Sequence, residues 1–113
     1  MVTRPYVPER GDAVWLAFDS RAGHEQVGRR RALVLSPAPY NEKSGLAILC
    51  PIASHAKGYP FEVRLPEGCV VQGVVLADHA KSLDWRVRGV SLIERLPAGV
   101  TAEVLAKLSV LLD

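Results

Sequence analysis

The stretch EQVGRRRALVLSP, residues 25–37, decides how this chain is interpreted. From Ala32 onward it is a run of apolar strand formers that ends at a proline, a pattern typical of a β-strand. Three arginines, Arg29, Arg30 and Arg31, stand directly before that run. Because like charges repel, three neighbouring arginines favour either an anionic partner or a solvated rim that keeps a strand edge from pairing wrongly.

The size and composition of the chain predict one ordered globular domain over residues 1–113, since 49% of the residues are hydrophobic. Cys50 and Cys69 are too few for a disulfide scaffold and fit a reducing compartment. The opening segment 1–12 is broken by prolines, so we expect no signal peptide. The longest apolar run, 46–53, is shorter than the about 20 residues of a membrane span. We therefore expect a cytoplasmic protein that does not enter a membrane.

Short segments with apolar or alternating patterns recur along the chain, separated by turn residues. This spacing predicts a small barrel or a strongly curled sheet over about residues 8–96. Between the first two segments, Asp19 to Arg30 form a long polar loop, and loops of about a dozen residues in compact domains are often functional. Residues 21–31 hold four arginines against Glu25 alone, so the positive charge is local. The expected strands are residues 13–18, 31–37, 46–53, 61–65, 70–78 and 89–96.

The end of the chain has the period of an amphipathic α-helix, which we expect over about residues 101–112. Thr101 is a candidate N-cap, and Glu103 would then lie in the first turn, where the helix dipole favours an anion. The apolar face of this helix is expected to pack on the sheet or on another subunit. That face contains Val104, Leu105, Leu108, Leu111 and Leu112.

Several short motifs, each weak alone, occur together over nearly the whole chain. They are Gly11-Asp12, Trp15, Glu25-Gln26, Gly28, Arg30 followed by LVLSP, Tyr40-Asn41, Gly45, KGYPFEV at 57–63, Ala77-Asp78, Lys81-Ser82, Trp85-Arg86 and Arg88-Gly89. In this order and spacing the chain resembles the MazF/PemK-type toxins, the endoribonuclease (mRNA interferase) halves of bacterial toxin–antitoxin pairs.

The resemblance implies a mainly β fold with a C-terminal α-helix, an SH3-like small barrel of the MazF/PemK/CcdB toxin type that acts as a homodimer. It also implies sequence-specific cleavage of single-stranded RNA, mostly mRNA, without a metal ion or other cofactor. Attack by the 2′-hydroxyl would leave a 2′,3′-cyclic phosphate and a 5′-hydroxyl. A cognate antitoxin with an acidic, partly disordered tail would cover the RNA groove.

Among the three arginines, Arg30 matches the catalytic position of the family, and we expect it to contact the scissile phosphate. A planar guanidinium can bind two phosphate oxygens at once, whereas its pKa above about 12 makes it a poor base. Stabilisation of developing charge is therefore its expected role. Glu25 is a candidate proton acceptor or a residue that orients Arg30. Arg29 and Arg31, the latter in place of a common proline, are expected to hold the RNA backbone.

The sequence departs from the family at the end of the third expected strand, where Ala53 stands in place of a usual Thr or Ser. A methyl group cannot donate a hydrogen bond, and loss of such a donor lowers a rate by about 10²- to 10³-fold. Ser54 is therefore a candidate catalytic residue. Neighbours on a strand point to opposite faces, so Ser54 needs a bulge or bend to take over the role. The alternatives are a slow enzyme, or a serine that only serves a turn.

Further basic residues lie outside the arginine run and are candidates for RNA binding. Trp85 stands among some of them, and a base could stack on it, although we expect it first in the core or a dimer interface. Histidines and cysteines are scattered without ligand spacing, so we expect no metal site. The additional candidate RNA-binding residues are Lys57, Lys81, Arg86 and Arg88.

Two other functions stay open at this stage. The gyrase-poisoning CcdB toxins share this fold and act on a protein target without cutting RNA, and a fold alone does not decide function. A second alternative is an RNA-binding homologue with weakened catalysis, which would keep the groove and lack the hydroxyl at position 53. The arginine run within 25–37 favours the nuclease over the protein poison.

Overall fold

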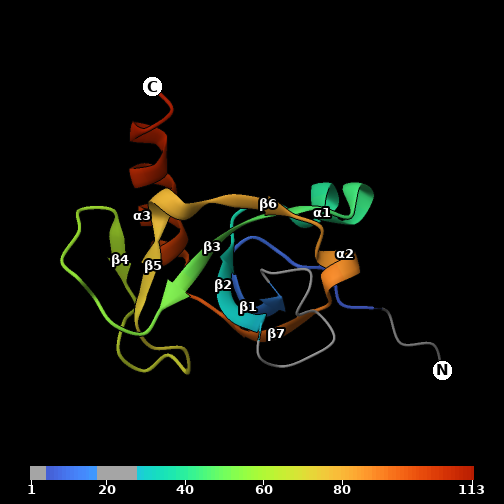
Figure 1. The fold of residues 1–113 in the computed structure, drawn as a ribbon, viewed down its shortest axis with the longest axis horizontal. Helices are drawn as coiled ribbons and strands as arrows, with labels where there is room; N and C mark the ends of the chain where they lie inside the picture. The colour runs from blue at the N-terminus through green and yellow to red at the C-terminus, as the bar shows by residue number, and fades with distance from the viewer. Residues whose placement is uncertain (1–4, 18–27) are drawn as a thin grey trace.

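The computed structural model describes residues 5–17 and 28–113, in which β-structure predominates (Figure 1). Within these residues seven strands form a bent antiparallel sheet in the order β4-β5-β3-β2-β1-β7, with β6 paired to β3 off this path. No described residues pair β4 with β7, so the sheet curls without closing. The strands are β1 (Asp12–Ala17), β2 (Arg29–Val34), β3 (Ala47–Ala53), β4 (Glu62–Arg64), β5 (Val74–Leu76), β6 (Lys81–Leu83) and β7 (Val90–Arg95).

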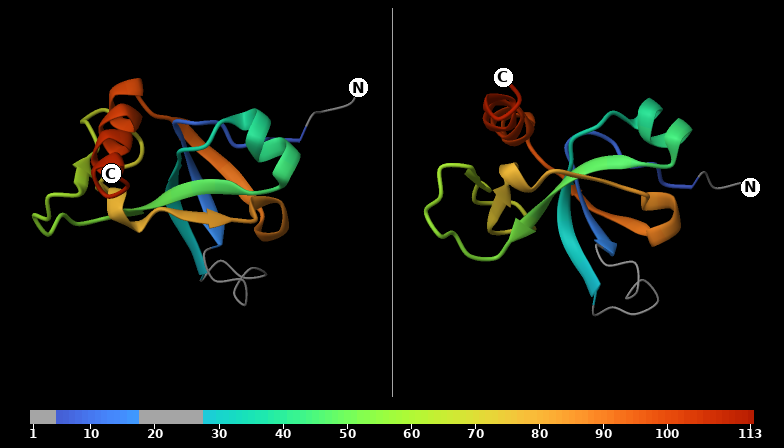
Figure 2. Two further views of the ribbon diagram at one scale, coloured as in Figure 1. Left: turned by 90° about the horizontal axis from the view of Figure 1, so that it is seen from above. Right: turned by 45° about the horizontal axis from the view of Figure 1, so that its top comes forward.

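Helical segments cover two ends of this sheet. Figure 2 shows α3 beside β4 and β5, with α1 and α2 at the opposite end of the molecule. The contacts agree, because α3 packs on β4, whereas α1 contacts β3 and α2 contacts β1. The helical segments are α1 (Ala38–Ser44), the 3-10 turn η3 (Ala77–His79), α2 (Trp85–Arg88) and α3 (Ala98–Val110).

Alternation along the central strands produces two hydrophobic clusters, one on each face. Leu33 belongs to the cluster that includes residues of α3, whereas Ala32 and Leu16 belong to the cluster that includes Trp85 of α2. Burying each large apolar side chain stabilises the fold by about 1.5–3 kcal/mol. Since both faces of the central strands are covered, β1 and β2 form a rigid base for the arginines at the start of β2.

The expected fold class is confirmed, with corrections to individual elements. β2 begins at Arg29, two residues earlier than expected, and part of the expected 19–30 loop lies outside the described residues. The sequence analysis also missed β6, α1 and α2. In α1 the proline at position 39 fits the first turn, where a missing N–H does no harm, and Gly45 ends the helix in the left-handed conformation at φ 75°.

The prediction that Thr101 caps the C-terminal helix is wrong. α3 begins at Ala98 after Pro97, whose fixed φ suits a residue that precedes a helix. Thr101 is therefore inside the helix, where it is buried and its hydroxyl has no hydrogen-bond partner among the described residues. Glu103 consequently lies beyond the first turn, 4.0 Å from the ammonium of Lys107. The helix ends at Val110, and the two leucines after it are exposed.

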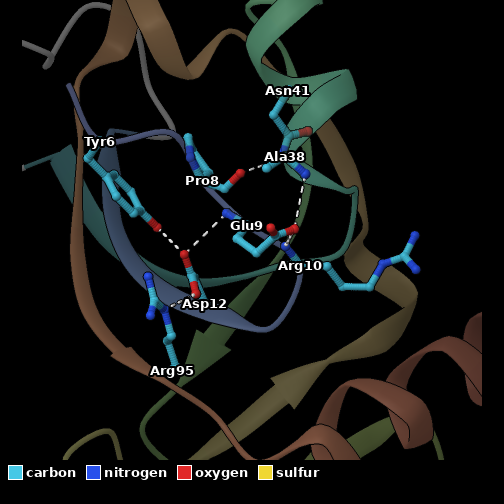
Figure 3. A network of polar contacts seen from close by, with 8 residues as sticks. All are labelled: Tyr6, Pro8, Glu9, Arg10, Asp12, Ala38, Asn41 and Arg95. Atoms are coloured by element: carbon cyan, nitrogen blue, oxygen red, sulfur yellow. Dashed lines mark hydrogen bonds and ion pairs between the residues drawn. The ribbon is translucent and has the colours of Figure 1, made fainter. Parts of the chain in front are cut away.

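A polar network fixes the segment that leads into β1 (Figure 3). The carboxylate of Asp12, only 1% exposed, accepts hydrogen bonds from the Tyr6 hydroxyl and, at 3.1 Å, from the Glu9 amide. The Nε of Arg95 lies 3.6 Å from its other oxygen. Burial and the hydrogen bond to Asp12 raise the pKa of the Tyr6 hydroxyl, so it stays protonated and remains a donor. The network therefore anchors the start of β1.

Asn41 joins α1 to the opening segment and to α2. Its side chain is fully buried, and its amide nitrogen donates to the carbonyls of Pro8 at 2.8 Å and Ser36 at 2.9 Å. Its amide oxygen accepts a hydrogen bond from the Ser36 hydroxyl at 2.6 Å. The indole nitrogen of Trp85 donates to the backbone carbonyl of Asn41 at 3.0 Å. Trp85 is thus a core residue, as the sequence analysis expected first.

Candidate functional site

The arginine run lies on β2, and the strand divides it between two faces. Arg30 pairs with Leu16 of β1 and shares the face of Ala32, whereas Arg29 and Arg31 share the opposite face. Leu16 is fully buried but Arg30, next to the end of the hairpin where β1 and β2 are connected, is exposed. The apolar face of β1 and β2 that contains Leu16 and Ala32 therefore ends at the charged, solvent-exposed side chain of Arg30.

Alternation on β3 separates Ala53 and Ser54 in the same way. Pro51 pairs with Ala32, and Ala53 lies two residues further along the same strand, so it shares the face of Arg30. Ser54 follows the end of β3 and is exposed. Its hydroxyl accepts a hydrogen bond from Arg31, on the other face of β2. The structure therefore brings Ser54 to Arg31 rather than to Arg30.

Arg31 connects three segments at this end of the sheet. Its Nη1 donates to the carbonyl oxygen of Gln72 at 2.7 Å, and its Nη2 donates to the Ser54 hydroxyl at 3.2 Å. Arg29, on the same face, donates through Nη2 to the hydroxyl of Ser91 on β7 at 2.9 Å. Two guanidiniums and two hydroxyls consequently lie on one face of β1, β2 and β7.

An exposed tryptophan that the sequence analysis did not name as a site residue lies on this face. Trp15 is the cross-strand partner of Arg31 on one side and of Ser91 on the other. Its side chain is 41% exposed although its strand neighbours are buried. The signal was present in the sequence, because AVWLAF is apolar on both faces and one of those faces carries the arginines.

Arg88 is brought to the same hairpin from far along the chain. Its Nη1 donates to the carbonyl oxygen of Ala17, the last residue of β1, at 2.8 Å. Its Nε lies 2.6 Å from a carboxylate oxygen of Asp84. The hydrogen bond from Arg88 lowers the pKa of the Asp84 carboxyl, which keeps that carboxylate charged. α2 therefore holds Arg88 beside the strand that pairs with Arg30.

The remaining predicted cations do not gather at one point. Lys57 follows β3 in a loop whose amides at 57 and 58 donate to the carboxylate of Glu62, at 3.0 to 3.1 Å. Lys81 is exposed on β6. Arg86 lies over the Trp85 ring at 5.0 Å and donates to the carbonyl of Glu42, on the side of α1. The predicted catalytic Glu25 lies outside the described residues.

The described residues contain no group of three or more His, Cys, Asp or Glu side chains placed to hold a metal ion. Burial raises the pKa of the Cys50 thiol to about 12, so it is a neutral thiol and not a ready ligand. Along the same described stretches, no helix is both long and apolar enough to cross a membrane.

Comparison with known proteins identifies the class to which this curled sheet with its C-terminal helix belongs, that of small bacterial toxins. The family of PemK-like, MazF-like toxins of type II toxin–antitoxin systems matches residues 9–112. The chain is 52% identical over 89 residues to the endoribonuclease toxin MazF of Escherichia coli K12. This alignment covers 79% of this chain and 78% of the Escherichia coli protein.

Solved structures agree with this assignment. A MazF crystal structure from Deinococcus radiodurans has a TM-score of 0.86 at 59% identity, covering 96% of this chain and 98% of that one. A MazE-MazF crystal structure from the same organism also has a TM-score of 0.86, at 55% sequence identity. The match covers 96% of this chain and 97% of that one. The chain belongs to the PemK-like, MazF-like toxin family. The resemblance seen in the sequence is confirmed, and so is the enzyme class, endoribonuclease toxin.

Proposed function

We propose that this endoribonuclease toxin cleaves single-stranded RNA, mRNA above all, at short specific sequences and without a metal ion. The observation that carries the proposal is Arg30, which is exposed at the end of the β1–β2 hairpin where the two strands are connected, at the position where the resemblance implies a catalytic arginine. A guanidinium there can face a phosphate while its strand is held by the buried core on both faces. Binding of a protein target in the manner of CcdB would not require an arginine at this place.

In the proposed reaction the 2′-hydroxyl oxygen of the RNA attacks the adjacent phosphorus, and the 5′-oxygen of the next nucleotide leaves and takes up a proton from water. The products are a 2′,3′-cyclic phosphate and a 5′-hydroxyl. Arg30 donates hydrogen bonds to the phosphate oxygens, on which negative charge increases in the transition state. Glu25 is the proposed acceptor of the 2′-hydroxyl proton, and Arg88 supports the end of β1 beside Arg30.

Ala53 gives a specific reason to expect a slow enzyme. It shares the face of Arg30, where relatives carry a hydroxyl, and its methyl group cannot donate to the phosphate. The weakened-catalysis alternative therefore differs from the main proposal in degree, since Arg30 serves the reaction in both.

The proposed partners are single-stranded RNA, a second copy of the chain and a cognate antitoxin. MazE-MazF complexes of Deinococcus radiodurans provide the precedent for an antitoxin. An acidic, disordered tail would be attracted to the same arginines as RNA and would compete with it. The cytoplasm is the proposed location, because the substrate is mRNA. The proposed RNA-binding side chains are Arg29, Arg31, Lys57, Lys81, Arg86 and Arg88.

The test is to incubate the purified, antitoxin-free protein with a long single-stranded RNA in EDTA and to determine the chemistry of the new ends. The proposal predicts discrete cuts that leave 5′-hydroxyl ends. A substrate with a single 2′-deoxy sugar at a mapped site should resist cutting at that site only. Loss of cutting in EDTA with rescue by a divalent ion, or cutting of the deoxy substrate, would refute the proposed chemistry.

A further inference from the structure

We propose that Arg31 and Ser54 together form a preformed cradle for an RNA phosphate next to the scissile one, on the opposite face of β2 from Arg30. The inference rests on the proposed function, because it assumes that RNA crosses this end of the sheet. It assigns Ser54 to substrate binding and not to the chemistry at Arg30. It also gives a role to Arg31.

The first argument is the number of donors that remain available. A guanidinium has five N–H donors in a planar fork, and Arg31 uses Nη1 for the Gln72 carbonyl and Nη2 for the Ser54 hydroxyl. None of the ion pairs among the described residues involves Arg31. The guanidinium is thus held in place by a carbonyl and a hydroxyl. Neither of these groups carries a negative charge, so neither neutralises the charge of Arg31. An anion is the partner that such a cation favours.

The second argument is the direction of the Ser54 hydroxyl group. Its oxygen accepts a hydrogen bond from Arg31, so its own proton is free to be donated elsewhere. Ser54 is exposed, and its hydroxyl lies 3.2 Å from Nη2, so one phosphate oxygen can reach both groups. A hydroxyl and a guanidinium placed together in this way supply two donors to one phosphate.

The third argument is that the cradle is rigid before RNA arrives. Gly73 has φ +121°, and a Cβ at that position would lie 2.0 Å from the carbonyl oxygen of Ala53. Only glycine lets the chain before β5 approach the end of β3 this closely. The approach brings the Gln72 carbonyl and the Ser54 hydroxyl within reach of the Arg31 side chain. It agrees with the pairing of Ala53 with Val74, which joins β3 to β5 (Figure 1).

The surroundings favour a single strand of RNA over an isolated anion. Trp15, directly across from Arg31, presents an exposed indole on which a base can stack. Arg29 lies two residues from Arg31 on the same face, about 6.7 Å along the strand at the usual rise per residue. Two cationic groups that follow one another along β2, with an indole beside Arg31 on β1, supply partners for neighbouring phosphates and for one base of a single strand.

The test measures binding of a non-cleavable RNA, 2′-deoxy at the mapped cut site, by fluorescence anisotropy over a range of salt concentrations. Arg31→Ala should weaken binding about 10- to 100-fold and reduce the slope of log K against log salt by about 0.7, the value for one phosphate of a single strand. Ser54→Ala should weaken binding less, and should have no further effect when Arg31 is already alanine. At subsaturating RNA the cleavage rate of each variant should fall in proportion to its loss of RNA affinity.

A matched control removes one charge elsewhere. Lys43→Ala alters an exposed cation on α1, which follows the opposite end of β2 from the arginines (Figure 2), and should leave the salt slope unchanged. If Arg31→Ala leaves binding and slope at the parent values, or affects them no more than Lys43→Ala, the cradle is refuted, while cutting by the parent still supports the proposed function. If Arg31→Ala or Ser54→Ala instead abolishes cleavage with binding intact, the assignment to binding is wrong. A parent protein that neither binds nor cuts RNA would overturn both.

Discussion

On the proposed mechanism, introducing a hydroxyl at position 53 should make RNA cleavage faster. Ala53 is the last residue of β3 and shares the face of Arg30, so a threonine side chain there would point to the same side as the guanidinium. Ala53 is only partly buried, and β-branched residues suit strands, so Ala53→Thr should fold normally. The new hydroxyl would donate to the phosphate that Arg30 is proposed to contact.

The magnitude follows from what one positioned donor contributes. Removing a single donor of this type from an enzyme lowers the rate by about 10²- to 10³-fold, or about 2.7–4 kcal/mol of transition-state stabilisation. Because nothing else in this site has been tuned to a threonine, we expect Ala53→Thr to recover the lower end, an increase in kcat of about 10²-fold. The RNA dissociation constant should change little, since a donor that acts mainly in the transition state affects kcat.

The assay is single-turnover cleavage of a short RNA that contains a mapped cut site, at saturating protein. Ala53→Val is the matched control, because valine has the shape of threonine and lacks only the hydroxyl. It should cut at the rate of the parent. Equal rates for the threonine and valine variants would refute the reasoning, since they would mean that no donor is missing on the face of Arg30.

Three further predictions concern the framework that holds the site. Asn41→Ala should lower the free energy of unfolding by at least about 3 kcal/mol, because it leaves several buried polar groups without partners, and a denaturation midpoint near that of the parent would contradict this. Gly73→Ala should destabilise the protein by more than the about 1–2 kcal/mol that a non-glycine residue costs in the left-handed conformation, because the added Cβ would clash with the backbone of Ala53. It should also weaken RNA binding. Chemical denaturation measures the loss of stability, and fluorescence anisotropy measures the loss of binding. Arg88 lowers the pKa of the Asp84 carboxyl. The ion pair between Arg88 and Asp84 is therefore fully present at pH values above the ordinary aspartate pKa of about 3.9, and it is lost only as the pH falls through the lowered pKa. An NMR titration should show a midpoint below that of a free aspartate, and Arg88→Ala should move it upward.

Much of the sheet could be predicted because its signals are local. The run after Arg31 and the alternation in 61–65 mark strands without reference to the rest of the chain. The start of α3 was misplaced because Thr101 is a good cap by type, whereas Pro97 decides where the helix begins. α1 was missed because a short helix with two prolines near its start resembles a turn until its buried Asn41 is seen among its partners.

In the candidate site, too, some features follow from the local sequence and others only from the tertiary fold. Alternation alone assigns Arg30 to one face and Arg31 to the other once β2 is known. The contact between Arg31 and Ser54 could not be predicted, because it depends on how closely the chain at Gly73 approaches the end of β3. Such an approach follows from the packing of distant segments.

The most direct test of the account is the effect of Arg30 on chemistry apart from binding. Single-turnover cleavage and RNA affinity should be measured for the parent, Arg30→Ala and Arg30→Lys, with Lys43→Ala as a charge control. The account predicts that Arg30→Ala lowers the cleavage rate by at least about 10²-fold while affinity changes far less, and that lysine, which lacks the planar fork, restores little. An alanine variant that cuts at the parent rate would contradict the claim that this arginine stabilises the transition state.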